Sequence, residues 1–136
     1  MFDCGYNGNY WVKYALRCLP NNVRDTWTEK LAFVSVSDSD ARRLTRSFCR
    51  ERDIIVLSER IVPADCMDES EANVRYFVFV VLHEVAHAIC DHRPPNEISA
   101  TENSAQEDEA DRLAFKWYND FLITICHPDL PEFTKD

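Results

Sequence analysis

Residues 80–92 read VVLHEVAHAICDH, an apolar stretch interrupted by two histidines and a glutamate. Burying three ionisable side chains in such a stretch is costly unless a partner compensates for them. The pattern His83-Glu84-x-x-His87 places two imidazoles one helical turn apart, where both can reach one metal ion. Glu84 lies about 100° around the helix from His83, so it flanks the pair. This spacing is typical of two zinc ligands and a general base that acts on water.

The valines around this motif would also suit a strand, but the length of the stretch and the spacing of its histidines favour a helix. We expect that helix to run from about Val74 to Cys90 or Asp91. His92 follows His83 by about 180° around the helix, so we expect an exposed residue near the helix C-terminus and no ligand. Cys90 is more typical of core packing than of metal binding. In an alternative interpretation, the two histidines of the motif bind no metal and have hydrogen-bond partners within the core.

A second helix is predicted over residues 104–125. On a helical wheel, Glu107 and Asp111 stand on or beside its apolar face, apart from the polar residues of the solvent face. Those solvent-face residues are Asp108, Glu109, Arg112, Lys116, Asn119 and Asp120. A buried carboxylate needs a charged partner or a metal. We therefore expect Glu107 to be the third metal ligand and Asp111 to accept a hydrogen bond from a histidine ring.

Simpler interpretations of both carboxylates stay open at this point. Ser104-x-x-Glu107 fits a capping box, in which Glu107 would only satisfy the start of the helix. Asp111 could pair with Arg75 or Arg112 instead of a histidine.

The rest of the chain predicts an α+β fold, a small sheet on a few helices, within a single domain over residues 1–136. The predicted elements are a helix over residues 9–19, a strand over 31–36, a helix over 41–51 capped by Ser39 or Asp40, and a strand over 53–57 that could continue to Ile61. The polar segments 63–73 and 92–103 and the tail 127–136 are expected to be irregular.

The composition argues against several classes of function. A net charge of −9 and a pI of about 4.8 argue against nucleic acid or an anionic membrane as a direct partner. Two glycines leave no glycine-rich phosphate loop. We see no secretory signal and no run of about 18 apolar residues, so we expect a cytoplasmic protein without a membrane span. The six cysteines include no C-x-x-C pair, which favours reduced thiols and argues against a cysteine-built zinc site.

The segment HEVAHAICDH, followed by QEDEADRLAFKW, resembles the ImmA/IrrE family of small gluzincin-type metallopeptidases. The resemblance covers residues 77–117 and implies a minimal zincin-like domain. It implies zinc bound by His83, His87 and Glu107, with Glu84 as the base and Asp111 at an acidic or amide position beside the site. The sequence departs from the family pattern at Cys90-Asp91 and at Leu113, and neither departure touches the implied ligands.

Motif and resemblance together predict a zinc-dependent metalloendopeptidase that hydrolyses a peptide bond in a protein substrate. The resemblance suggests a transcriptional repressor of a mobile element as one such substrate. Two alternatives are a zinc-bearing regulatory domain that binds a partner without cleaving it, and a metal-free structural domain. Tyr76, Tyr118 and His127 are candidates for a transition-state hydrogen-bond donor, and the sequence does not choose among them.

Overall fold

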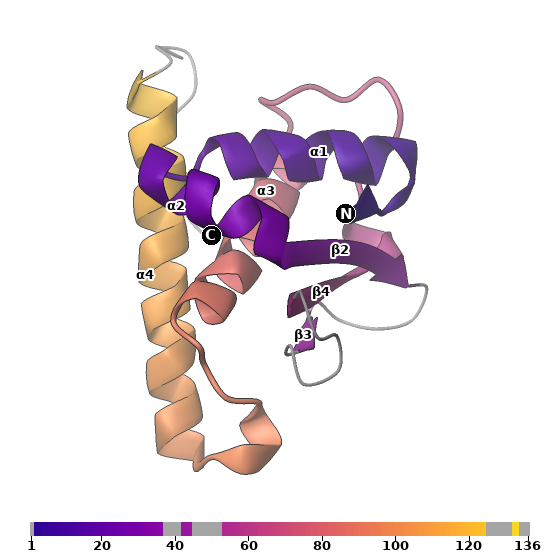
Figure 1. The fold of residues 1–136 in the computed structure, drawn as a ribbon. Coiled ribbons are helices and arrows are strands. Elements are labelled where there is room, and N and C mark those ends of the chain that lie inside the picture. The colour runs from indigo at the N-terminus through magenta and orange to yellow at the C-terminus, as the bar shows by residue number, and fades with distance from the viewer. Residues whose placement is uncertain (1, 37–41, 45–52, 125–131, 134–136) are drawn as a thin grey trace.

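The computed structural model of the chain describes residues 2–36, 42–44, 53–124 and 132–133. These residues form an α+β fold, as predicted (Figure 1). The helices are α1 (Gly5–Arg17), α2 (Asn21–Trp27), α3 (Ala72–Ile89) and α4 (Ala100–Thr124). The strands are β1 (Phe2–Asp3), β2 (Leu31–Val36), β3 (Arg42–Leu44) and β4 (Asp53–Ser58). Short 3-10 turns occupy η1 (Thr28–Lys30), η2 (Glu59–Ile61) and η3 (Pro95–Glu97).

The sheet has the strand order β1-β2-β4-β3. β1, β2 and β4 are parallel, and β2 pairs with β4 over its whole length, from Leu31 opposite Asp53 to Val36 opposite Ser58. Both strands are largely apolar, and β4 is mostly buried while β2 is buried over its first three residues, as is usual when helices cover a parallel sheet. The predicted strands over residues 31–36 and 53–57 are therefore confirmed. The suggested extension to Ile61 is wrong, because the Ser58 side chain accepts a hydrogen bond from the Arg60 N–H and starts a 3-10 turn there.

The helix predicted over residues 41–51 is wrong where the structure describes that segment. Arg42–Leu44 is a strand that pairs antiparallel with β4, with Leu44 opposite Ile54. Leu44 and Phe48 have helical spacing in the sequence, but β4 offers an unpaired edge, and strand pairing outweighs the local pattern. The other residues of the predicted helix, and its suggested caps Ser39 and Asp40, lie outside the described residues.

The first helix was predicted over residues 9–19 and instead begins at Gly5. The Asn9 side chain accepts a hydrogen bond from the Cys4 N–H at 2.8 Å within this first part of the helix. Gly8 is needed for the close approach, because a Cβ at that position would lie 2.6 Å from the Cβ of Cys4. The short helix α2 was not predicted.

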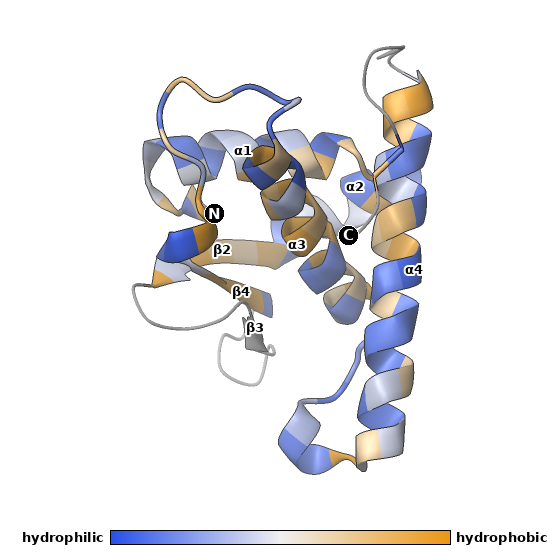
Figure 2. Ribbon diagram, turned by 180° about the vertical axis from the view of Figure 1, so that it is seen from behind, coloured by the Kyte–Doolittle hydropathy of each residue, from blue (hydrophilic) through white to orange (hydrophobic). Residues whose placement is uncertain are grey.

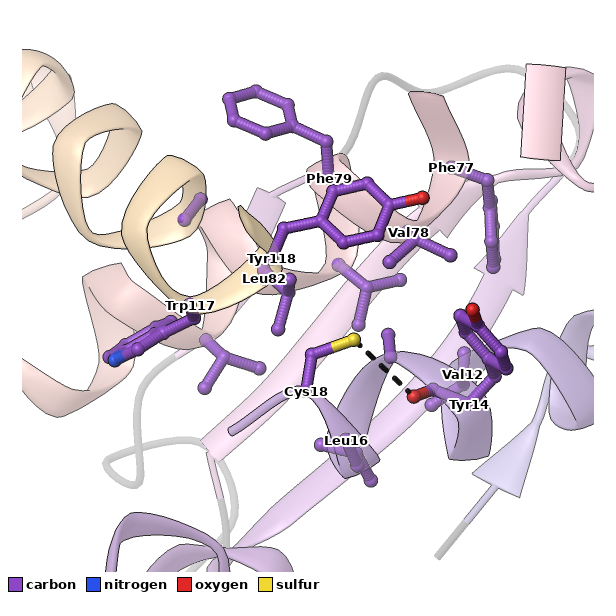
Figure 3. Packing of buried hydrophobic residues seen from close by; sticks show 14 of the residues in the cluster. Val12, Tyr14, Leu16, Cys18, Phe77, Val78, Phe79, Leu82, Trp117 and Tyr118 are labelled. Atoms are coloured by element: carbon purple, nitrogen blue, oxygen red, sulfur yellow. Dashed lines mark hydrogen bonds between the residues drawn. The ribbon is translucent and has the colours of Figure 1, made fainter. Parts of the chain in front are cut away.

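The core is built around α3, which packs against α1 and the sheet and also against α4. Figure 2 shows hydrophobic residues along most of α3, whereas hydrophilic and hydrophobic residues alternate along α4. Figure 3 shows side chains of α3 and α4 meeting those of α1 in one cluster. The members without exposed surface include Val12, Phe33, Ile55, Phe77, Val78, Leu82, Ala114 and Tyr118. The motif predicted to bind metal therefore lies on the central helix.

The described residues contain no helix with the length and apolarity needed to span a bilayer. Four of the six cysteines are described, and Cys4, Cys18, Cys66 and Cys90 are free thiols.

Candidate metal centre

The candidate site lies where α3 and α4 pack side by side (Figure 1). The Nε2 atoms of His83 and His87, both on α3, are 3.0 Å apart. The Glu107 carboxylate of α4 places Oε2 at 3.0 Å from His83 Nε2 and Oε1 at 3.0 Å from His87 Nε2. The structure thus brings together the three side chains predicted as ligands, close enough to bind one metal ion.

Asp111 contacts the far side of the His83 ring, as predicted, with Oδ1 at 2.8 Å from Nδ1. A carboxylate can only accept, so the ring donates its Nδ1–H to Asp111. In a neutral imidazole the other nitrogen is then unprotonated. In the neutral ring that metal binding requires, Nε2 therefore directs its lone pair towards His87 and Glu107.

Glu84 lies beside this cluster, with only 7% of its surface exposed. One of its carboxylate oxygens and a ring nitrogen of each histidine all lie within 4.8 Å of one another. Glu84 is therefore in the flanking position that the helical wheel predicts.

A cleft of about 490 Å³ opens onto the cluster. Ser58 and Arg60, at the end of β4, line one part of it, and Tyr76 and Val80 of α3 line another. The same cleft reaches His83, Glu84, Glu107 and Asp111, so these side chains are accessible from outside.

The start of α4 decides between the two interpretations of Glu107. The Ser99 hydroxyl accepts a hydrogen bond from the Glu102 N–H and donates one to the Glu102 carboxylate, both at 3.1 Å. Ser99 thus caps the helix, five residues before the predicted capping residue Ser104. The helix begins at Ala100, so the irregular segment predicted over residues 92–103 is shorter than expected. Ser104 is inside the helix and Glu107 is about two turns from its start, so the capping interpretation of Glu107 is wrong.

The prediction that His92 is exposed is also wrong, since only 8% of its side chain is accessible. The helix α3 ends at Ile89, and Asp91 adopts a left-handed conformation with a φ of 52°. The His92 N–H then donates to the His87 carbonyl at 3.0 Å, which turns the chain back over the helix end. The helical wheel no longer applies at this position. The His92 ring instead lies between His87 and Glu109. Glu109 itself is 43% exposed, which agrees with its predicted place on the solvent face of α4.

Cys90 is partly buried near these two residues, and donor atoms of Cys90, His92 and Glu109 lie within 4.8 Å of one another. Burial, and secondly the Glu109 carboxylate, raise the pKa of the Cys90 thiol to about 11. Without a metal, the thiol is therefore protonated at neutral pH. The sequence motifs did not reveal the His92–Glu109 contact.

The three candidates for a transition-state donor have different positions. Tyr118 has no exposed surface and packs in the core beside Phe79 of α3, so it does not reach the cleft (Figure 3). Tyr76 lines the cleft and is 48% exposed. His127 lies outside the described residues. No protein-family model, curated protein or solved structure matches this chain.

Proposed function

We propose that this chain is a zinc-dependent metallopeptidase of the ImmA/IrrE type, with zinc held by His83, His87 and Glu107. The observation that carries the proposal is the mutual distance of 3.0 Å between the Nε2 atoms and the Glu107 oxygens. Zinc–ligand bonds of about 2.0–2.1 Å in a tetrahedron put ligand atoms about 3.3 Å apart. The observed spacing agrees to within a few tenths of an ångström, and three protein ligands leave a fourth position open, as in catalytic sites.

The protons of the cluster also favour a cation there. His83 presents a lone pair and Glu107 is a carboxylate, so two hydrogen-bond acceptors face each other at 3.0 Å. Such a contact is repulsive unless a proton or a metal ion lies between the two atoms. A divalent cation bound at this point would satisfy both acceptors together with His87.

Bound zinc supplies a Lewis acid that lowers the pKa of a water molecule and polarises a peptide carbonyl. Glu84, beside the ligands and largely buried, accepts the proton of the attacking water and delivers it to the leaving amine. Asp111 holds the His83 ring in the orientation and tautomer that ligation needs. The cleft past Tyr76, Val80 and Arg60 gives a peptide access to Glu84.

The experiment compares the wild type with Glu84→Gln, which keeps the size of the side chain and removes its basicity. Both proteins should contain zinc in equimolar amount by elemental analysis. Only the wild type should cut a complex peptide library, with the cleavage products identified by mass spectrometry. Glu97→Gln is the matched control, because Glu97 is an exposed glutamate in the η3 turn, away from the cluster.

Each alternative has its own outcome. Absence of zinc from the wild type, even after zinc addition, would refute the metal site. The metal-free structural domain would then be the remaining alternative. Zinc in the wild type without cleavage would favour the regulatory domain that binds a partner. Equal cleavage by Glu84→Gln and the wild type would show that the hydrolytic mechanism is wrong.

A further inference from the structure

A second row of side chains stands behind His87, on the side away from the proposed metal. The Nδ1 atom of His87 lies 2.8 Å from Nδ1 of His92. The Nε2 atom of His92 lies 2.5 Å from Oε1 of Glu109, on α4. The rings of His87 and His92 meet edge to face, with their centroids 5.0 Å apart. The three side chains form a continuous hydrogen-bonded row from α4 to the ligand position.

The direction of each hydrogen bond follows from the carboxylate at the end of this row. Glu109 can only accept, so His92 donates its Nε2–H. A neutral His92 ring then has an unprotonated Nδ1, which accepts the Nδ1–H of His87. His87 is left with the lone pair of Nε2 directed at His83 and Glu107.

We infer that His92 and Glu109 are positioning residues, which fix the tautomer and ring orientation of His87 and so strengthen metal binding. Asp111 bonds the His83 ring directly, whereas Glu109 acts on the His87 ring through the ring of His92. The inference rests on the proposed zinc site and adds to it two residues outside the ligand set. Groups that orient a metal-bound histidine typically change metal affinity or activity by about 10–100-fold.

The fold holds this row in place independently of a metal. The left-handed residue Asp91 returns the chain over the end of α3. The Gln106 side chain then clamps the next residue, since it accepts from the Arg93 N–H and donates to the Arg93 carbonyl, both at 3.0 Å. His92 is thereby held between the end of α3 and the face of α4 that carries Glu109.

A second metal site at Cys90, His92 and Glu109 is the competing explanation for the same cluster. The direct His92–Glu109 hydrogen bond favours the positioning role. The two explanations predict different zinc stoichiometries, and the test measures this quantity.

The test uses the full chain and the variants His92→Phe and Glu109→Gln, with Asp108→Asn as the control. Asp108 is an exposed carboxylate next to Glu109, so its variant loses the same charge at almost the same place. Zinc affinity is measured by competition with a chromophoric chelator. We expect His92→Phe to weaken zinc binding by about 10–100-fold. Glu109→Gln should lose less, up to about tenfold, because its amide oxygen can still accept from His92.

Long-range proton–nitrogen NMR shows which nitrogen of each histidine ring carries the proton. A purely structural role of His92 would not fix this tautomer. In the zinc-loaded wild type, His92 should carry its proton on Nε2, whereas His83 and His87 should carry theirs on Nδ1. A His92 ring protonated on Nδ1 alone, or His87 bound to zinc through Nδ1, would overturn the inference. This NMR measurement needs no variant. If His92→Phe fails to fold, Glu109→Gln still tests the inference, because the Glu109 side chain is 43% exposed and its replacement should not disturb folding.

The outcomes separate this inference from the proposed function. A wild type that binds no zinc overturns both. A wild type that binds zinc while His92→Phe and Glu109→Gln match Asp108→Asn in affinity overturns only the positioning role. A second equivalent of zinc that both variants lose would assign the cluster to a second metal and overturn the positioning role as well.

Discussion

Replacing Glu107 by alanine tests the ligand set most directly. The side chain is 46% exposed and lies inside α4, so its removal leaves no cavity and retains a good helix former. Without metal, the variant should therefore unfold at nearly the wild-type temperature. With zinc, it lacks the Glu107 carboxylate, whose oxygens lie 3.0 Å from the Nε2 atoms of His83 and His87.

The size of the zinc-dependent loss can be worked out. Binding free energies of about 10–16 kcal/mol for four-ligand zinc sites imply roughly 2.5–4 kcal/mol for each ligand. Losing one ligand should then raise the zinc Kd by about 10²–10³-fold. An unfolding entropy of about 2.1 cal/mol/K per residue gives this 136-residue chain about 3.5 °C per kcal/mol. Because zinc stabilises only the folded state, the Tm at saturating zinc should fall by roughly 9–14 °C.

Thermal unfolding is followed by circular dichroism, with excess zinc and separately with a chelator, alongside a zinc titration. Asp108→Ala is the control, since it removes the neighbouring exposed carboxylate from the same helix. If Glu107→Ala keeps the wild-type zinc Kd, and the chelator lowers its Tm as much as that of the wild type, the ligand assignment is wrong. Glu84 or Asp111 would then be the third ligand.

Three further predictions concern the fold around the site. In the presence of a chelator, Ser99→Ala should lower the unfolding free energy by about 1 kcal/mol, whereas Ser104→Ala should change it by less than about 0.5 kcal/mol. A larger loss for Ser104→Ala than for Ser99→Ala would show that the helix begins at Ser104. Tyr118→Phe should change stability by less than about 1 kcal/mol and leave peptide cleavage intact, whereas a folded variant without cleavage would show that Tyr118 acts on the substrate. Burial raises the pKa of the Cys18 thiol in the folded chain, so its contribution to stability is complete below the unfolded pKa of about 8.5 and is lost as the pH rises above that value. The Tm should therefore fall less steeply between about pH 7 and 11 for Cys18→Ala than for the wild type. Parallel plots of Tm against pH would show that the pKa of Cys18 is not raised on folding.

The part of the site that depends on helical periodicity could be predicted from the sequence. His83 and His87, like Glu107 and Asp111, are pairs four residues apart, and each pair stands on one face of its helix. Apolar neighbours around each pair showed that these faces are turned inwards, so the two helices were expected to meet there. The structure brings all four side chains together, while their roles in metal binding stay predictions.

The errors occur where a local pattern was extended past the end of its element. His92 is wrongly assigned to solvent because the wheel treats α3 as continuous, whereas the chain reverses at Asp91. An aspartate tolerates the left-handed conformation, but without a glycine the sequence gives only a weak signal for it. At β3 the strand depends on pairing with β4, a contact that no local periodicity encodes.

The packing of α3 against α4 has a consequence for metal selectivity. Ala110 and Ala114 of α4 and Ala86 of α3 have no exposed surface and belong to one buried cluster. A close-packed interior resists expansion, so the backbone separation beneath the ligands is fixed before any ion arrives. Calcium takes six to eight oxygen ligands, and a fixed backbone that presents two imidazole nitrogens beside Glu107 would not supply them. Selectivity would thus originate partly in small apolar side chains that never touch the ion, because they keep the two helices from rearranging to offer other ligands.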